Sequence, residues 1–597
     1  MRSQVKSRAN YLKTMDAIGD GLLQKVRDTM KENNSMELRA TFDSFDFKIL
    51  ANVILKNHRN SDFHWITHYL TFDRISIAGL DDTKPLSTGR LFPMPQFLGI
   101  FYPYKHIKHR FSAEMAKKSV VINLSIVPYN HSKHCDVVQY LEVLQELLTE
   151  VYAPDEGSNT EEVSQLEKLE RTETLLKGKH IPLFGDLLGQ ERVTGAKKTR
   201  AGCDYSCEKF ECVIEAAAVW HAKQSFLGYT WEQLYSTQSA RDVGTVYNLR
   251  QRFGLVNVSS KVKSNFESAN SHMLSATKAY LCSAFMEYAG LDRFDGTPKQ
   301  ITSSDPKDLE RIIGCFVDEY VMLEFDVEKA LRQQKEQLLK QPQAEAAGTE
   351  RFQQSPIHSA GHIVALLQSV PNQGPVVLGV GKVLTPPPNI VSNTRTALVY
   401  VANAEAASQT TCMLDKKEGD GECNLRNAKL SVLYFRSRPR GMKYAFEMMR
   451  FTTCVKALYP QKVAHRIIQR QFVNWRGGDG KNVANDLKQE HFVKGHKTVL
   501  KDLVANKTLT AVERATKASC SLKGVSDNFD RQCLIAPEYT LHTSLSKQDD
   551  EREMIELVHS RRPFVFTSGR KHNSFPIPKS ALEQLDVVKL DALLNFR

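Results

Sequence analysis

Segments with strand character in this chain of 597 residues are short and concentrated before residue 186, whereas most of the later sequence has helical periodicity. Residues 38–47 (LRATFDSFDF) alternate and are rich in aromatic side chains, residues 120–127 (VVINLSIV) form an apolar run, and residues 181–184 (IPLF) end at Gly185. Alternation is typical of a strand with one buried face, and a short apolar run is typical of a buried strand. The distribution predicts a mixed α/β fold with a helix-rich C-terminal region.

Apolar residues at helical spacing predict long helices after the first strands. Asn485 is the expected N-cap of one of them, because its side chain accepts amide hydrogen bonds well at that position. Residues 341–356 have the composition of a linker. The predicted helices cover residues 134–152, 210–226, 262–288, 306–340, 444–472, 485–503 and 580–594, and a late strand is predicted at 563–566.

These elements divide the chain into six segments. Residues 1–152 contain the first half of an α/β core, 153–178 an acidic linker, 179–206 a core strand with Gly-Asp, 207–340 a helical insertion, 341–430 a linker and loop-rich segment, and 431–597 a basic helical segment that completes the core and adds a C-terminal subdomain. An α/β core interrupted by a large helical insertion is therefore the expected architecture.

The composition excludes several classes of protein. The first residues lack the apolar core of a signal peptide, and no stretch approaches 18 uninterrupted apolar residues, so we expect neither secretion nor a membrane partner. The 11 cysteines are few and odd in number, which favours a reducing compartment over a disulfide framework. An intracellular protein is expected, and the sequence leaves room for a homo-oligomer.

The net charge of +12 is concentrated in one segment. Residues 434–502 contain 15 Lys and Arg against 5 Asp and Glu, a net of +10. Such a basic segment is suited to neutralising phosphates, so the predicted partner is a nucleic acid, in particular DNA, with a nuclear location. A solvated basic helix face is the alternative. The candidate nucleic-acid-binding residues are Arg470, Arg476, Lys481, Lys488, Lys494 and Lys497.

Acidic residues occur at the predicted strand ends and on one helix. Asp43 and Asp46 lie in TFDSFDF, Asp186 follows IPLFG, and Asp486 and Glu490 are four residues apart in NDLKQEH. Phosphodiester chemistry with two metal ions needs carboxylates that converge from separate elements. We therefore consider Asp43, Asp186 and Glu490 as catalytic residues and as ligands of Mg²⁺ or Mn²⁺, with Asp46 and Asp486 as alternates.

These acids also have ordinary structural interpretations. An aspartate after a glycine at a strand end is a common turn residue, and Asp486 near a helix start compensates the helix dipole. Glu490 and Lys494 are spaced as a surface ion pair.

Other candidate sites are weaker. The spacing of Cys203, Cys207 and Cys212, followed by His221, is not that of a zinc knuckle, so we expect buried thiols and no zinc site. The residues 477–480 (GGDG) form a turn whose amides could hold a phosphate, although a plain loop is the simpler interpretation.

Seven segments in order resemble a large, multi-copy family that is known only as a domain of unknown function. They include TFDSFDF, IPLFGDLLGQERVTGAK, VWHAKQSFLGYTWEQLY, SARDVGTVYNLRQRF, RGMKYAFEMMRF, FVNWRGGDGKNVANDLKQEHFVKGHK and FVFTSGRKHNSF. The resemblance covers residue 38 to the C-terminus and implies a transposon-derived protein with an RNase H-like core. It would make Asp43, Asp186 and Glu490 the acids of a two-metal transposase or nuclease of the DDE type.

Two alternatives to such an enzyme stay open. In one, the fold is kept as a catalytically inactive DNA-binding protein, and in the other it is a scaffold for protein partners. The 42 residues before Asp43 have no zinc-finger spacing, so the chain is expected to be truncated or domesticated relative to a transposase.

Overall fold

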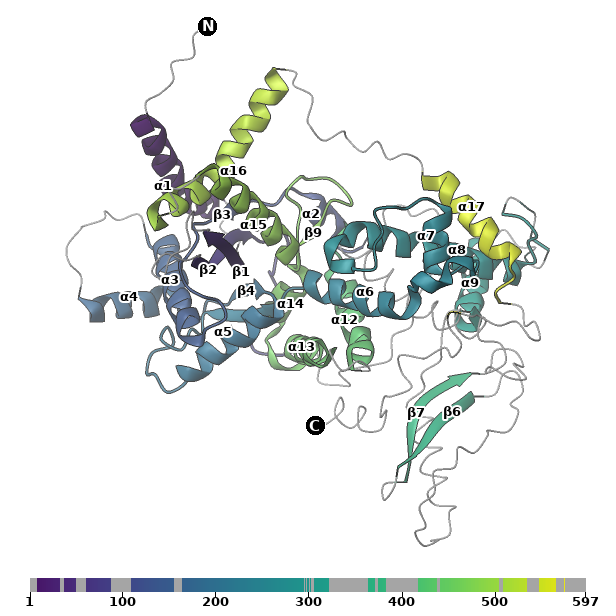
Figure 1. Cartoon of the computed structure of the whole chain (residues 1–597). Coiled ribbons are helices and arrows are strands. Elements are labelled where there is room, and N and C mark those ends of the chain that lie inside the picture. The colour runs from purple at the N-terminus through teal and green to yellow at the C-terminus, as the bar shows by residue number, and fades with distance from the viewer. Residues whose placement is uncertain are drawn as a thin grey trace.

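The computed structural model shows a mixed α/β protein built around one five-stranded sheet (Figure 1). No described helix is both long and apolar enough to cross a membrane. The structure describes residues 8–32, 37–49, 61–86, 109–154, 164–294, 305–320, 363–370, 374–382, 417–436, 441–503, 508–533 and 547–564, together with Gly296, Pro298, Lys299, Ile301 and Ser574.

The sheet has the strand order β3-β2-β1-β4-β5. β1 pairs antiparallel with β2 over 12 residues, β2 pairs antiparallel with β3, and β4 and β5 run parallel to β1. The predictions at 38–47 and 181–184 are confirmed, whereas the run at 120–127 is a strand only over its first part. The strands are β1 (Leu38–Ile49), β2 (Ser61–Phe72), β3 (Val121–Asn123), β4 (Ile181–Gly185) and β5 (Val213–Ala217).

The prediction of a helix over 210–226 is wrong in its first half. Residues 213–217 (VIEAA) form β5, which pairs with β4 along its whole length. Alanine favours helices in isolation, but local propensity is weak when a buried sheet edge offers hydrogen bonds and packing. The helix begins later, as α6 (Trp220–Leu234).

Helices cover both faces of the sheet, because alternate residues of β1 are buried on opposite sides. Phe42 packs against Tyr140 of α3 (His134–Tyr152), with ring centroids 5.4 Å apart. Phe45 packs edge-on against His496 of α15 (Asn485–Asp502) at 5.5 Å. Figure 1 shows α3 and α5 on one side of the sheet and α15 and α16 on the other. The remaining helices of this region are α1 (Arg8–Glu32), α2 (Ser112–Ala116), α4 (Gln165–Leu176), α5 (Leu187–Thr199) and α16 (Leu509–Gln532).

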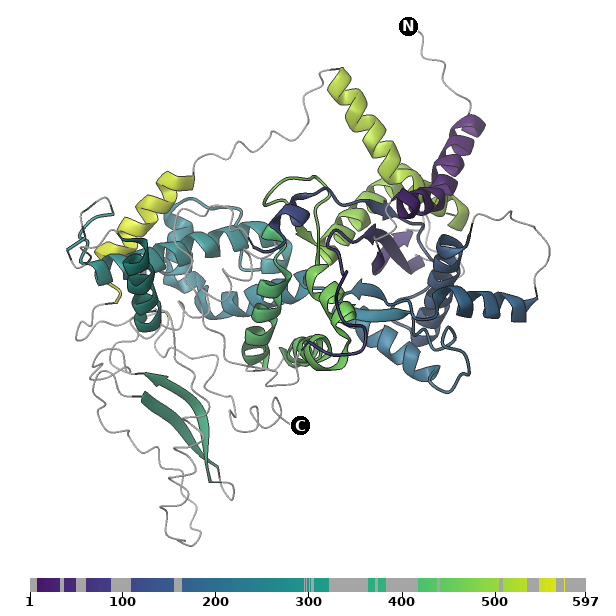
Figure 2. The same cartoon turned by 180° about the vertical axis from the view of Figure 1, so that it is seen from behind.

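A helical block extends away from the sheet (Figures 1 and 2), and it follows β5 in the chain. It begins with α6, and α17 from the C-terminal part of the chain packs on α8. The prediction at 262–288 is confirmed as α8, whereas that at 306–340 is confirmed over 306–320 and otherwise lies outside the described residues. The block contains α7 (Val246–Arg252), α8 (Phe266–Ala289), α9 (Pro306–Tyr320) and α17 (Lys547–Ser560).

The C-terminal half returns to the sheet. The predicted helix over 444–472 is two helices, because a π-helical turn at Cys454–Leu458 and Pro460 interrupt it. The helix over 485–503 is confirmed as α15, but Asn485 is not its cap. Ala484 precedes the helix, and the side-chain Nδ2 of Asn485 donates to the Arg470 carbonyl at 2.7 Å. The elements are α12 (Gly421–Arg436), α13 (Met442–Thr453), α14 (Gln461–Gln469), β8 (Phe472–Val473) and β9 (Val483–Ala484).

Part of the predicted loop-rich segment 341–430 is regular structure. β6 (Ile363–Val370) and β7 (Gly374–Lys382) pair as an antiparallel hairpin. The predicted linker 341–356 and the predicted helix 580–594 lie outside the described residues.

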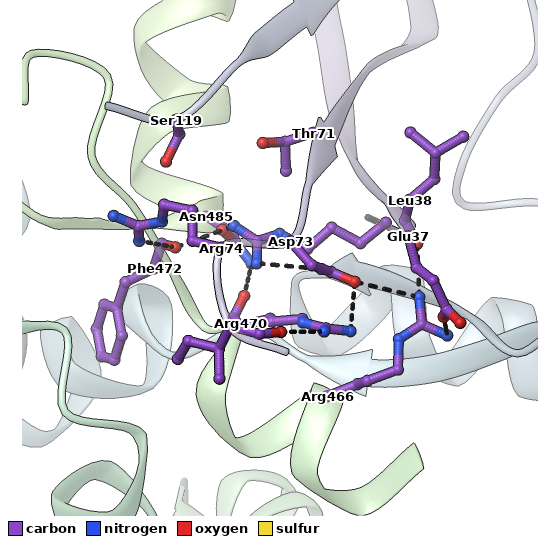
Figure 3. A network of polar contacts seen from close by, with 12 residues as sticks. Glu37, Leu38, Thr71, Asp73, Arg74, Ser119, Arg466, Arg470, Phe472 and Asn485 are labelled. Atoms are coloured by element: carbon purple, nitrogen blue, oxygen red, sulfur yellow. Dashed lines mark hydrogen bonds and ion pairs between the residues drawn. The ribbon is translucent and has the colours of Figure 1, made fainter. Parts of the chain in front are cut away.

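A buried ion cluster joins the C-terminal half to the first two strands (Figure 3). Asp73 follows β2 and pairs with Arg470, with Arg466 at 3.5 Å and with Arg39 of β1 at 3.9 Å. The four side chains are at most 3% exposed. Arg470 was a candidate phosphate contact, but the structure places it in the core, where its guanidinium also donates to the Ile75 carbonyl.

Candidate metal centre

Asp43 lies in the middle of β1, on the face of the sheet that α15 covers. It shares this face with Phe45, two residues further along the strand, and Phe45 packs on α15. The Asp43 side chain is buried, at 7% exposure, and one of its oxygens accepts the Ser44 amide at 2.7 Å. The strand therefore presents a carboxylate to the helix that carries Glu490.

Asp186 lies beside Asp43 because of the sheet register. Ala40 pairs with Leu183 and Thr41 with Phe184, so the same register continued by two residues sets Asp43 opposite Asp186. Asp186 is also the N-cap of α5, and its Oδ1 accepts the Gly189 amide at 2.7 Å.

Glu490 and His221 complete a compact group with Asp43. One ligand atom from each of the three side chains lies within 4.8 Å of the other two. Glu490 comes from α15 and His221 from the first turn of α6, and the Glu490 Oε1 to His221 Nε2 distance is 3.6 Å. Three elements that are distant in the sequence thus meet at one point. Within the described part of the chain, no cysteine belongs to such a group.

Neighbouring carboxylates add to the cost of burying the charge of Asp43. Burial raises the pKa of Asp43 well above its ordinary value, and the neighbouring carboxylates of Asp186 and Glu490 raise this pKa further. The amide of Ser44 acts in the opposite direction, but the combined effect keeps the pKa high. A cation bound here would replace the proton and relieve this repulsion.

The donor atoms fit a divalent transition metal. His221 Nε2 is buried and has no hydrogen-bond partner, as expected for a nitrogen that is available to a metal. Two carboxylates with one imidazole suit Mn²⁺ or a similar ion better than Mg²⁺, which prefers oxygen ligands. The sequence did not predict His221 as a ligand with the acids. It was considered only together with Cys203, Cys207 and Cys212, where no zinc site was expected.

The two alternates, Asp46 and Asp486, do not belong to this group of three side chains. Asp46 is half exposed and bonds to His64 Nδ1 at 2.9 Å. Asp486 is 1% exposed, and its carboxylate accepts backbone amides of α6.

Most of the basic candidates are exposed around α15 and the β8–β9 turn. Lys488 is half buried, and its Nζ lies 4.5 Å from the ring centroid of Trp475, which also has Arg476 at 4.6 Å. The amides of Gly477 and Gly478 in the turn are used by Asn474 and Ala116, so they are not free to hold a phosphate. The exposed candidates are Arg476, Lys481, Lys494 and Lys497.

Comparison with protein-family models matches residues 116–542 to a family described as a family of unknown function (DUF6589). The matched stretch contains Asp186, His221 and Glu490, while Asp43 precedes it. No curated protein and no solved structure matches the chain.

Proposed function

This chain belongs to the DUF6589 family of unknown function, and we propose that it is a metal-dependent enzyme of transposon origin that cuts or joins DNA strands. One observation carries the proposal: ligand atoms of Asp43, His221 and Glu490 lie within 4.8 Å of one another. Asp43 is buried and its raised pKa shows that its charge is unfavourable there, which is the environment expected of a carboxylate that a cation would stabilise.

The roles of the residues follow from their atoms. Asp43 and Glu490 supply carboxylate oxygens and His221 supplies a ring nitrogen, while Asp186 offers the further carboxylate that a second ion would need. A bound divalent ion supplies Lewis acidity toward a phosphate and an activated water at neutral pH.

The sheet supports an RNase H-like core. Three antiparallel strands are followed by two parallel strands in the order β3-β2-β1-β4-β5, and the acids lie on the central strand and at the end of its parallel neighbour. Helices pack on both faces, and the third acid comes from a helix late in the chain.

A basic stripe on α15 supports a nucleic-acid partner. Residues 490, 494, 497 and 501 follow helical spacing, so Lys494, Lys497 and Lys501 extend along the helix surface from Glu490. The three lysines are exposed, and none forms an ion pair with a described residue. A phosphate backbone along this stripe would lead to the carboxylates, and a DNA substrate would imply a nuclear location.

The test is nicking of supercoiled plasmid in Mn²⁺ by the full chain and two matched variants. Asp43→Asn removes a candidate ligand, whereas Asp46→Asn makes the same change three residues along β1, at a side chain outside the group. We expect Asp43→Asn to lower the nicking rate at least about 100-fold with plasmid binding retained, because an essential ligand is lost. Asp46→Asn should stay within about threefold of the unmodified protein.

Equal nicking by the unmodified chain and by Asp43→Asn would refute the proposal. If the unmodified chain retards the plasmid but does not nick it, a catalytically inactive DNA-binding protein is the better description, because the basic stripe acts without the metal centre.

A further inference from the structure

The other carboxylate on this face of α15, Asp486, contacts the backbone of α6. Its Oδ2 accepts the amide of Trp220 at 2.9 Å and that of His221 at 3.1 Å, and its Oδ1 lies 3.2 Å from the Trp220 amide. Asp486 is 1% exposed and is separated from these residues by about 265 positions in the sequence. A long-range contact thus holds the start of the helix.

This contact does what a local cap does in most helices. The first amides of a helix have no partner within the helix and are usually capped by the residue before it. That residue in α6 is Val219, which has no acceptor in its side chain. Asp486 replaces the missing cap, and the helix dipole favours its negative charge at this end.

The same helix face also positions the His221 side chain. Asp486 and Glu490 are four residues apart on α15 and therefore lie on one face. Asp486 fixes the backbone of His221, and Glu490 faces its imidazole at 3.6 Å. No hydrogen bond fixes His221 Nε2, and the imidazole packs edge-on against Trp220 of the same first turn, with ring centroids 4.6 Å apart, so its position depends on where α6 begins.

We infer that Asp486 is a positioning residue that sets His221 in the metal centre by capping α6 from α15, and that it is not itself a ligand. The effect on metal binding rests on the proposed function, whereas the capping of α6 by Asp486 does not require a metal. It also means that the helical block contributes to the centre and must be docked on α15 for the centre to form.

Cobalt binding tests the inference, because the visible spectrum of Co²⁺ responds to a nitrogen ligand. Co²⁺ is titrated into the full chain and into Asp486→Ala, His221→Ala and the double variant. We expect Asp486→Ala to weaken binding about tenfold, as the loss of a residue that orients a metal ligand does, and to shift the spectrum toward that of His221→Ala. The double variant should bind no more weakly than His221→Ala, because Asp486→Ala acts only through the His221 ligand, which is already absent.

Amide hydrogen exchange measures the cap directly and without metal. The amides of Trp220 and His221 should exchange faster in Asp486→Ala, and to a smaller degree in Asp486→Asn, which keeps one acceptor and the side-chain volume. Thr245→Ala is the matched control, because it removes the cap of α7 at Asn248, within the same helical block. It should leave the Co²⁺ spectrum and the exchange of α6 unchanged.

Two results would overturn the inference. One is unchanged protection of the two amides in Asp486→Ala. The other is an equal loss of Co²⁺ affinity from Asp486→Ala whether or not His221 is present, which would make Asp486 a ligand in its own right. If the unmodified chain binds no Co²⁺, the proposed function fails, while amide exchange still decides whether Asp486 caps α6.

Discussion

The buried carboxylate of Asp43 lies where its own charge is unfavourable. Burial is the largest cause of its raised pKa, and Asp186 and Glu490 add to it. A group with such surroundings favours ligand binding at the expense of the stability of the empty protein. The position of Asp43 should therefore affect the stability of the metal-free protein as well as metal binding.

We predict that Asp43→Asn stabilises the metal-free protein at neutral pH by about 1–2 kcal/mol, because a neutral amide avoids the repulsion. The folded pKa of Asp43 lies above its unfolded value, so its favourable contribution is complete below the unfolded pKa and is lost as the pH rises through the folded pKa. The gain from the variant should therefore be small in acid and should grow as the pH rises. Urea denaturation of both proteins over a pH series, with chelator present, measures it.

Saturating Mn²⁺ should reverse the order of stability, because only the unmodified protein binds the ion through Asp43. A variant that is less stable than the unmodified protein at every pH would show that the Asp43 carboxylate serves the empty fold.

At the level of elements, the sequence predicted those parts of the site that have a local signal. The alternation over 38–47 identified β1 and with it Asp43, and the apolar run before Gly185 identified Asp186 at a strand end. The spacing of Asp486 and Glu490 placed both on one helix face. The sequence could not assign their separate roles, because the partner of Asp486 is a backbone 265 positions away.

His221 was missed because β5 was missed. The pattern over residues 210–226 predicted one helix, so no strand end was expected before Trp220. Because β5 runs parallel to β4, the residues that follow the two strands lie at the same end of the sheet, where Asp186 is. Tertiary pairing overrides local propensity here, and a single sequence does not show which strand a short segment will join.

The basic stripe of α15 gives a prediction at this scale. Lys494→Ala and Lys497→Ala should each reduce the slope of log affinity against log salt for duplex DNA by about 0.9, because each lysine neutralises one phosphate. Binding titrations at several salt concentrations measure the slope. Lys168→Ala on α4 is the control, since Lys168 is an equally exposed helical lysine and should leave the slope unchanged. Unchanged slopes for the first two variants would remove α15 from the binding surface.

Segments that are far apart in the sequence pack together on the sheet. The sheet is formed by residues up to 217, and one of its faces is covered by α15 and α16, which come more than 260 residues later. Figure 2 shows these late helices next to α1 and the first strands. The metal centre lies at this junction, because Asp43 comes from the early part and Glu490 from the late part.

Two ion pairs join the same early and late segments, and they differ mainly in burial. Asp73 pairs with Arg470 in the core, where both side chains are at most 3% exposed (Figure 3). Asp82 pairs with Lys462 at the surface, where the side chains are 63% and 32% exposed. Comparing the two pairs therefore shows how much stability depends on burial of the charges, since both pairs link the same segments.

We predict that Asp73→Asn lowers the free energy of unfolding by about 3–5 kcal/mol, because it removes the carboxylate shared by three buried guanidinium groups and leaves only Arg466 with another acidic partner among the described residues, Glu37. Asp82→Asn should change it by less than about 1 kcal/mol, and 1 M salt should remove that difference, since an exposed pair is screened. Urea denaturation followed by far-UV circular dichroism compares them. If both variants lose equal stability, the buried cluster does not hold the early and late segments together. The metal centre must then depend on the packing of α15 against β1 alone.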